Sequence, residues 1–559
     1  MILLLCCISC EKSLDLYPED QLSDATFFLS GNDFKTYSNQ FYSSLATFNA
    51  DDDETDITRG SGSNSVSNSS YVPSPSDAVW DNSYALIRSL NFGIGKYLEA
   101  SKDVQEESKV YYAEMKFFRA YFYFNLLKRF GGVPKIDKVL SLSDTDYLYG
   151  KRAEREDIFN FILSDLDEAI NILPLQSQLA DSDNGRVTLG AVLAFKARVA
   201  LFEACWQKYH NKSKNDSLFK LAQESARLVI DSDEYHLFDK RDLLGEDSYR
   251  YYFTLSKVKS NPAGLTKSSQ EETILANRYD ADIRESPRVE RSYESNPTKK
   301  LADMFLDVNG LPITHPQSVF KGYQGLTSEY ELRDPRMDIF FVKPMERFYV
   351  YTQPAFTANF DNLNDPTRGV VNEVQFGQFT QTGYKTTKLV GEVTVPLGID
   401  YPVIRFTEVL LIYAEASYEI KNYITDDELD YSINKLRDRV GMVHLTNSHV
   451  KKYGLDMLEE IRRERTIELF AEGFRYDDLR RWKTAEVEMS ESVRGIKLKG
   501  SEYENDPRWS SLTFNTDKDG FIVFEQANQR VFQQKHYLRP IPTRQILLNP
   551  NLTQNPGWE

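Results

Sequence analysis

The side chains of this 559-residue chain that could take part in catalysis do not fall into an enzyme's spacing. Neither the G-x-S-x-G nor the H-E-x-x-H pattern occurs, and Cys205 lies on a predicted core face. Of the six histidines only His444 and His449 lie close together, and a solvated loop explains them better than a metal site. Carboxylates are abundant, so a glycoside hydrolase with two acids about 5–9 Å apart stays open, although no pair stands out.

A second pattern comes close to a calcium loop. The stretch "NTDKDGFIVFEQ" places Asn515, Asp517 and Asp519 on that template, but its twelfth position is Gln526 where the loop needs Glu. Asp519-Gly520 between two apolar runs is also a strong signal for a hairpin turn. The sequence therefore favours a β-hairpin here.

The N-terminal stretch "MILLLCCISCEK" ends its apolar run at a cysteine. This run is far shorter than the roughly 20 residues of a membrane-spanning helix and is typical of the end of a secretory leader. Cys7-Ile8-Ser9 before Cys10 reads as a bacterial lipobox, which predicts a lipid on the Cys10 thiol. Since no positive segment precedes the run, we expect the true start to lie upstream.

Composition limits the kinds of partner. The net charge is −17, which argues against a nucleic-acid binder and against attraction to an anionic lipid surface. Hydrophobic residues make up 41% and charged residues 27%, as in ordinary globular proteins. Membrane attachment would therefore depend on the lipid at Cys10.

Helical periodicity dominates two parts of the chain. Apolar residues recur every three or four positions in "WDNSYALIRSLNFGIGKYLEA", "AEMKFFRAYFYFNLLKRFGGVP", 158–173, 190–204 and 218–229. The stretches "IRFTEVLLIYAEASYEI" and "DELDYSINKLRDRVG" predict an antiparallel pair, and "LEEIRRERTIELFAEGFRYDDLRRW" predicts one long charged helix. The succession of helix pairs predicts a mainly α, tetratricopeptide-like architecture.

Between these helical parts, Gly, Pro, Asn and Asp punctuate short apolar runs. We expect a leader at 1–10 and a single domain at 11–559. Its helical repeats would lie mainly at 80–235 and 400–485, and its loop-rich part, with a few short strands, mainly at 235–400 and 485–559.

Ordered sequence blocks along nearly the whole chain resemble the SusD/RagB family of nutrient-binding outer-membrane lipoproteins. The blocks are "SCEKSLDLYPEDQLSDATFF", "AEMKFFRAYFYFNLLKRFGGVP", "GRVTLGAVLAFKARVALF", "RDPRM", "PVIRFTEVLLIYAEA", "RRERTIELFAEGFRYDDLRRW" and "YLRPIPTRQILLNPNLTQNPGW", together with Trp80, Tyr84, Ile87 and Asn91. Each block alone is weak, but their order and completeness make the resemblance specific.

The resemblance implies four tetratricopeptide-like helix pairs packed against a loop-rich half. It also implies a partner, a SusC-like TonB-dependent outer-membrane transporter, and a ligand that is an oligosaccharide or, in some members, a peptide. The family is not enzymatic, so we expect no catalytic residues, no metal and no organic cofactor. We expect the protein to be lipid-anchored in the cell outer membrane, facing outward.

Ligand residues vary within the family and are predicted here from chemistry and position. Sugars are bound by aromatic rings and planar polar groups, and the resemblance places the start of the first long helix near the ligand face. The candidates are Asp53, Asp56, Arg59, Tyr71, Trp80, Asn82, Tyr293 and Tyr323. The alternative for each is an ordinary loop residue or, for Trp80, a helix-packing anchor.

These observations favour a surface lipoprotein that binds oligosaccharides and delivers them to the transporter. Three alternatives stay open: a peptide-binding member, a glycoside hydrolase, and a helical scaffold for other proteins. The sequence names no glycan.

Overall fold

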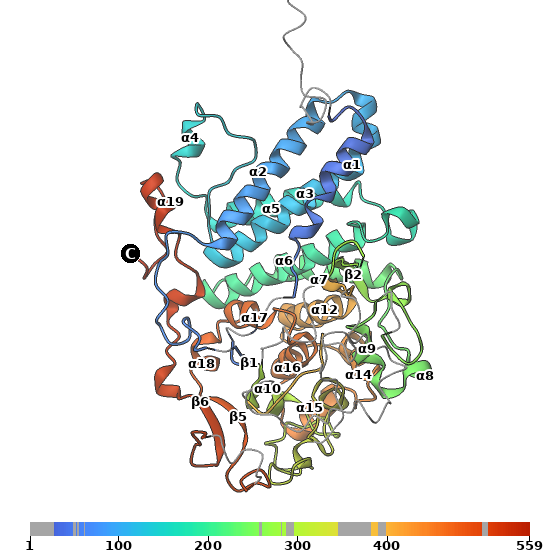
Figure 1. The fold of residues 1–559 in the computed structure, drawn as a ribbon, viewed down its shortest axis with the longest axis vertical. Helices are drawn as coiled ribbons and strands as arrows, with labels where there is room; N and C mark the ends of the chain where they lie inside the picture. The colour runs from blue at the N-terminus through green and yellow to red at the C-terminus, as the bar shows by residue number, and fades with distance from the viewer. Residues whose placement is uncertain are drawn as a thin grey trace, which may run out of the picture.

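The protein is mainly α-helical, with a few short strands, which confirms the predicted fold class. The computed structural model describes residues 27–48, 52, 55–60, 62–256, 260–280, 282–286, 296–344, 382–389, 398–505 and 513–559. Cys10, Asp53 and Tyr293 lie outside these residues. In Figure 1 the long helices occupy the upper and middle parts, and the loop-rich segments lie below them.

The first long helices form an antiparallel pair. Helix α2 spans Ala78–Glu99 and α3 spans Lys102–Phe130, so only two residues connect them. The Asp77 side chain caps α2 and that of Ser101 caps α3, each accepting a hydrogen bond from a first-turn backbone N–H. Helix α3 ends at Phe130, and Gly131, with a φ of 77°, caps its C-terminus.

The following long helices stack in series. Helices α5 (Arg155–Ile170), α6 (Leu189–His210) and α7 (Asp216–Asp231) each pack against the previous one, and α5 packs on α3. Helix α12 (Phe406–Lys421) then packs on α7, and α16 (Met457–Leu469) packs on α12. Helices more than 170 residues apart in the chain thus lie side by side, as Figure 1 shows for α7 and α12.

Shorter helices fill the remaining space. They are α1 (Gly31–Asn39), α4 (Thr145–Leu148), α8 (Arg241–Leu244), α9 (Ser248–Tyr252), α10 (Lys299–Met304), α11 (Pro335–Phe340), α13 (Asp426–Tyr431), α14 (Ile433–Asp438), α15 (Asn447–Tyr453), α17 (Arg475–Arg481), α18 (Ala485–Glu488) and α19 (Thr543–Leu548). The predicted helix "DELDYSINKLRDRVG" is thus divided at Ser432 into α13 and α14.

Three two-stranded antiparallel sheets complete the described part of the fold. Strand β1 (Thr58–Arg59) pairs with β3 (Asn296–Pro297), β2 (Thr273–Asn277) with β4 (Tyr401–Arg405), and β5 (Val493–Lys497) with β6 (Phe521–Glu525). Just before β6, Thr516 bridges to Ile522 and the Asp517 N–H donates to the Phe521 carbonyl at 2.9 Å. This is the hairpin turn predicted at Asp519-Gly520.

A cluster of buried charges joins the helical and loop-rich parts. Arg405 of β4 pairs with Glu272 and Glu472, both at 2.7 Å, while Arg439 pairs with Glu272 at 2.9 Å and Glu468 at 2.8 Å. Burial alone would raise the pKa of Glu468, but Arg439 and its neighbouring guanidiniums lower it to about 2. These buried pairs therefore connect α16 to distant elements.

The single long helix predicted for "LEEIRRERTIELFAEGFRYDDLRRW" is wrong, because the segment forms α16 and α17 with a break between them. Ala471 and Gly473 take positive φ values of 62° and 79° there. The Asp52 carboxylate accepts hydrogen bonds from the N–H groups of Ala471 at 2.6 Å and Arg475 at 3.3 Å. A partner far away in the sequence thus stabilises the turn against continued helix.

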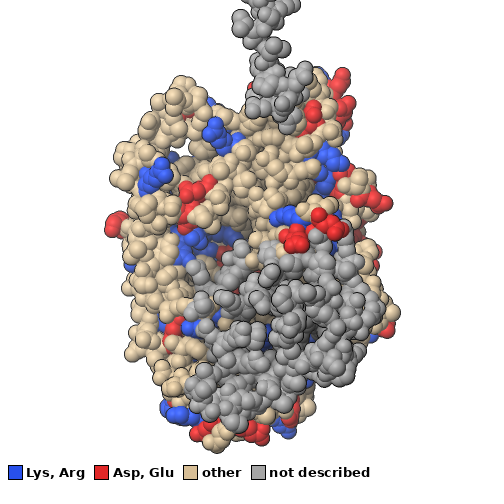
Figure 2. Space-filling model, in the orientation of Figure 1, with Lys and Arg blue, Asp and Glu red and all other residues tan. Residues whose placement is uncertain are grey.

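Charges of both signs are spread over the surface. Figure 2 shows basic and acidic side chains intermixed over the described part of this face, without a large patch of one sign. The net charge of −17 is therefore not gathered there.

Candidate functional site

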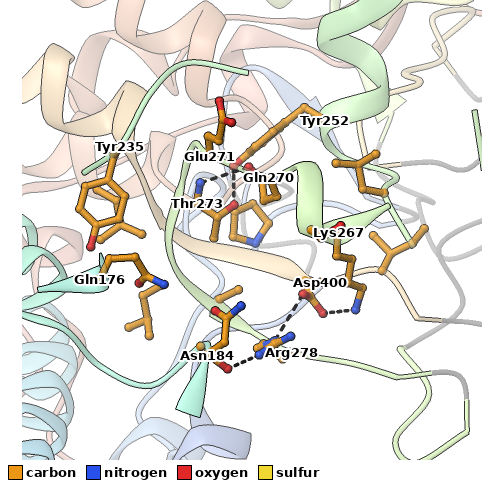
Figure 3. Close-up of a pocket in the computed structure, with 18 of the residues that line it drawn as sticks. Gln176, Asn184, Tyr235, Tyr252, Lys267, Gln270, Glu271, Thr273, Arg278 and Asp400 are labelled. Carbon is orange, nitrogen blue, oxygen red and sulfur yellow. Dashed lines mark hydrogen bonds and ion pairs between the residues drawn. The ribbon is translucent and has the colours of Figure 1, made fainter. Parts of the chain in front are cut away.

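A cleft of about 240 Å³ opens beside strand β2. Its walls come from separate segments: the turn before α6, residues 234–235, the end of α9, residues 267–276 and the approach to β4. Figure 3 shows these segments converging, with Tyr235 and Gln176 on one side and Lys267, Asp400 and Arg278 on the other. At about 30 Å³ per water molecule the cleft has room for roughly eight waters, so it suits one ring of a larger ligand.

Two tyrosines form the inner wall of the cleft. The Tyr235 hydroxyl is 2.9 Å from Thr188 Oγ1, at the N-cap of α6, and the Tyr252 hydroxyl is 3.0 Å from Thr273 Oγ1. Burial raises the pKa of Tyr235 to about 12 and raises that of Tyr252 as well. Both hydroxyls are thus protonated at neutral pH, and both rings are almost fully buried behind the polar rim.

An ion pair and a backbone contact fix one side of the rim. Lys267 Nζ is 2.6 Å from Asp400 Oδ1, and the same oxygen accepts a hydrogen bond from the Tyr279 N–H at 2.8 Å. Arg278 lies 3.8 Å from Asp400 and donates to the Asn184 carbonyl, as the dashed lines in Figure 3 mark. Asn184 and Gly185 form the turn before α6, and a Cβ on Gly185 would lie 2.5 Å from Arg278 Cδ.

Three amide side chains line the cleft with hydrogen-bonding capacity to spare. Gln270 Oε1 accepts from the N–H groups of Glu272 at 3.0 Å and Thr273 at 3.2 Å, which orients its amide nitrogen. Gln176 and Asn184 have no side-chain partner among the residues that the structure describes. Amides both donate and accept, so they suit a ligand rich in hydroxyl groups.

The carboxylates of the cleft are engaged by the protein. Glu234 accepts hydrogen bonds from the backbone and hydroxyl of Ser177, both at 2.7 Å, and Asp400 is held by Lys267. The more exposed Glu271 lies 3.6 Å from Lys240. Neither histidine nor cysteine lines the described part of the cleft. The arrangement therefore offers groups for binding, and its chemistry favours a polar, uncharged ligand.

Of the predicted ligand residues that the structure describes, none lines this cleft. Asp56 is buried and accepts two hydrogen bonds from Arg475, at 2.9 and 2.7 Å. Burial would raise the pKa of Asp56, but Arg475 and Lys300 lower it strongly. This contact explains Asp56 as a structural anchor for the segment before β1.

The predicted residues around α2 differ in exposure. Trp80 is 4% exposed and packs edge-on against Phe130, with ring centres 5.2 Å apart, which is the packing role considered as its alternative. Asn82 lies on the exposed face of the same helix. Tyr71 is half-buried beneath the Arg539 guanidinium, 4.4 Å from its ring centre.

Arg59 and Tyr323 both contact strand β6, although 264 positions separate them in the chain. The Arg59 guanidinium lies 4.7 Å from the centre of the Phe524 ring, and the Tyr323 ring centre lies 5.0 Å from that of Phe521. The Tyr323 hydroxyl donates to Asp303 at 2.8 Å. The structure thus brings both residues to one hairpin, away from the cleft.

One group of side chains has the composition of a metal site, namely Cys205, Glu415 and Glu419. Protein cations already occupy it: Arg481 donates two hydrogen bonds of 2.6 Å to Glu415, and Lys208 pairs with Glu419. Burial raises the pKa of the Cys205 thiol. These contacts explain the group as part of the core.

In the described part of the chain, no helix combines the length and the apolar character that crossing a lipid bilayer requires.

A sequence model of the SusD family matches residues 265–558, which is more than half of the chain. The chain belongs to the SusD family. A second model, described as "Starch-binding associating with outer membrane", matches residues 19–201 of this SusD-family chain. The resemblance inferred from the sequence blocks is thereby confirmed.

Two curated relatives are similar over much of their length. A SusD-like protein of Bacteroides ovatus is 24% identical over 408 residues, which cover 72% of this chain and 65% of the relative. SusD-like protein P2 of Formosa agariphila is 25% identical over 487 residues, or 86% of this chain and 80% of the relative.

Solved structures show the same fold. A SusD-like protein from Bacteroides fragilis superposes with a TM-score of 0.73 at 23% identity, covering 97% of this chain and 100% of that one. A SusD-like carbohydrate-binding protein from the same species gives 0.72 at 21% identity, covering 94% and 100%. One signal of the cleft is present in the sequence, because the dipeptide Asn184-Gly185, which forms the turn before α6, is typical of turns.

Proposed function

We propose that this SusD-family chain is a non-catalytic lipoprotein that binds oligosaccharides at the outer membrane and passes them to a SusC-like TonB-dependent transporter. The observation that carries the proposal is the family match over residues 265–558. The description of the second matching model, "Starch-binding associating with outer membrane", supports both the ligand class and the location.

The chemistry of the cleft beside β2 supports a saccharide ligand. Amide groups of Gln176, Asn184 and Gln270 and the guanidinium of Arg278 surround a space sized for one sugar ring. Planar polar groups of this kind match the directed hydrogen bonds of sugar hydroxyls. We therefore propose the cleft as a glycan subsite.

The ligand roles predicted from the sequence are also proposals. Asn82 is exposed, while Arg59, Tyr71 and Tyr323 are half-buried, so each presents part of its side chain to solvent. Asp53 and Tyr293 belong to the same set but lie outside the described residues. Trp80 and Asp56 are buried, so a ligand role for them would require the surrounding segments to move.

Binding tests the proposal directly. The full chain is screened against panels of neutral glycans and of peptides, and positive ligands are titrated by calorimetry. We expect saturable binding to at least one glycan, and binding to peptides alone would overturn the glycan assignment. Incubation with the same polysaccharides should release no new reducing ends, since release would indicate a glycoside hydrolase.

A variant of the cleft links binding to this site. Arg278→Ala removes a charge-assisted hydrogen-bond donor, whose loss weakens binding by about tenfold or more. Arg227→Ala is the control because Arg227 is an exposed arginine of α7 outside the cleft. If Arg278→Ala and Arg227→Ala bind the glycan equally tightly, the cleft is not the glycan site.

The anchor and the transporter need their own experiment. We expect mass spectrometry of the native protein from the outer-membrane fraction to find acyl chains on Cys10. We also expect a TonB-dependent transporter to co-purify with it. An unmodified Cys10 in a protein recovered from the cytosol would overturn this part of the proposal.

A further inference from the structure

A second, smaller cavity of about 80 Å³ lies where α16 meets α17, α18 and the end of α10. It shares no lining residue with the cleft beside β2 among the residues that the structure describes. Three arginines line it, namely Arg462, Arg463 and Arg475. Their guanidiniums differ in how far the protein already uses them.

Arg475 is fully used and forms part of the wall. It donates to both carboxylate oxygens of Asp56, and its remaining nitrogen donates to Thr466 Oγ1 at 3.0 Å. The Asp56 charge compensates that of Arg475 at this position. Arg475 therefore shapes the cavity without supplying a free donor to it.

Arg462 keeps hydrogen-bonding capacity. Its guanidinium lies 4.8 Å from the centre of the Trp482 ring and donates one hydrogen bond to the Tyr209 hydroxyl at 2.8 Å. Its nearest carboxylate, Glu419, is 3.9 Å away, and its buried Nε has no partner among the described residues. The side chain is only 12% exposed, so it is held in place by packing.

Arg463 supplies the second available cation. Its Nε lies 3.3 Å from each carboxylate oxygen of Glu460, whereas no described residue accepts a hydrogen bond from its two terminal nitrogens. The side chain is 23% exposed and, like that of the adjacent Arg462 on α16, lines the cavity. By contrast, Arg465 on the same helix makes two hydrogen bonds, at 3.0 and 2.9 Å, to Asp478.

Two carboxylates, Glu488 and Glu459, line the cavity but accept no hydrogen bond from Arg462 or Arg463 among the described residues. Glu488 forms an ion pair with Lys300, which also pairs with Asp56 at 3.2 Å and with Glu491 at 2.9 Å, and it lies 3.9 Å from Arg475. Glu459 is exposed at the helix surface. The lining thus combines two guanidiniums with spare donors, the Thr484 hydroxyl and one solvated acid.

We propose that this cavity binds one oxoanion group, either a carboxylate or a sulfate ester, through Arg462 and Arg463. Forked guanidinium donors match the paired oxygens of such groups. With room for two or three water molecules at about 30 Å³ each, the cavity admits the anionic group alone, so the molecule that carries it lies outside. The identity of the carrier rests on the proposed function: it is an acidic oligosaccharide with uronic acid or sulfated residues.

Equilibrium dialysis with radiolabelled sulfate and with radiolabelled glucuronate tests the cavity on the full chain at constant ionic strength. We expect saturable binding of at least one probe to a single site. Binding of sulfate alone would identify a sulfate ester as the natural group, and binding of glucuronate alone would identify a uronic acid. Binding of both would show that the cavity recognises the oxoanion that the two groups share. Absence of saturable binding for both would overturn the proposal.

Two substitutions of Arg463, whose side chain is only partly exposed, separate the effect of charge from that of geometry. Arg463→Gln should weaken probe binding by at least about tenfold, and Arg463→Lys should recover only part of it because lysine lacks the fork. Arg227→Gln, far from the cavity on α7, should leave binding unchanged. If Arg463→Gln binds as tightly as the unaltered chain, the assignment to this cavity is wrong.

Binding of neutral glycans is measured on the same variants. If the chain binds a neutral glycan but neither sulfate nor glucuronate, the oxoanion site is wrong and the proposed function stands. If the chain binds a probe, loses that binding in Arg463→Gln and binds no glycan, the site is supported and the proposed function is wrong.

Discussion

Arg481 of α17 and Glu415 of α12 are joined by two parallel hydrogen bonds of 2.6 Å, deep in the core. Trp482 Nε1 donates a third hydrogen bond to the same carboxylate, also at 2.6 Å. Burial would raise the pKa of Glu415, but Arg481 lowers it to about 2. The pair thus holds the C-terminal helices against the central stack.

Glu415→Gln should destabilise the protein strongly. The substitution keeps the side-chain volume but removes the charge opposite Arg481, and breaking one partner of a buried pair costs about 3–5 kcal/mol. Asp231→Asn is the control, because Asp231 and Arg227 form an exposed pair whose loss costs at most about 1 kcal/mol. Urea unfolding measures both, and equal midpoints would refute the structural role.

Stability should fall as the pH rises from about 4.5 to 7, through Glu329. Burial raises the pKa of Glu329 to about 7, and its Oε1 accepts a hydrogen bond from the Tyr384 hydroxyl at 2.7 Å. In that pH window the folded protein keeps a proton that the unfolded chain loses. The stabilisation is therefore complete below the ordinary pKa of glutamate and is lost as the pH passes about 7.

Glu329→Gln should remove this pH dependence and, at pH 7.5, stabilise the protein by up to about 3 kcal/mol relative to the unaltered chain. The exposed neighbour Glu331 provides the control variant Glu331→Gln. Thermal unfolding between pH 4 and 8 reports the slopes, and an unchanged slope in Glu329→Gln would contradict the prediction.

Trp80 and Asn82 test whether the start of α2 contacts ligand. Trp80→Ala removes a ring packed against Phe130 and should lower the unfolding free energy by about 3–5 kcal/mol. Asn82→Ala changes an exposed position and should alter stability by at most about 0.5 kcal/mol. Calorimetry then compares the glycan affinity of Asn82→Ala with that of the unaltered chain. Equal affinities would exclude Asn82 from the ligand site.

Gly185→Ala should weaken glycan binding in the cleft. Gly185 has a φ of +95°, and an added Cβ would lie 2.5 Å from Arg278 Cδ, which displaces that side chain from the rim. Gly454→Ala is matched in backbone strain, with a φ of +66° and nothing within 4 Å of its Cβ. Both should lose about 1–2 kcal/mol of stability. Only Gly185→Ala should lose affinity for the glycan. Equal affinities of the two variants would show that Arg278 does not contribute to the site.

The long helices were predictable because their signal is local. Apolar faces such as that of Ile158, Ile162 and Leu166 repeat at helical spacing, and all three residues are fully buried. The glycines and prolines that end these helices act on their own neighbours. Local periodicity therefore located α2, α3, α5, α6, α7 and α12.

Features that depend on distant partners were not predictable. The segment of α16 and α17 has helical composition throughout, yet Asp52 stabilises a turn at Ala471. The cleft has the same character, since Gln176, Tyr235, Gln270 and Asp400 come from separate segments that meet only in the fold. No spacing rule within one segment marks such a site.

The contact between Asp52 and the turn after α16 also constrains the order of folding. The carboxylate precedes Ala471 by 419 residues, so this contact forms only when almost the whole polypeptide is available. Closing a loop of that length carries a large entropic penalty and slows the search for native contacts. We expect the N-terminal helix pairs to form early, and the contact between Asp52 and the turn after α16 to form last.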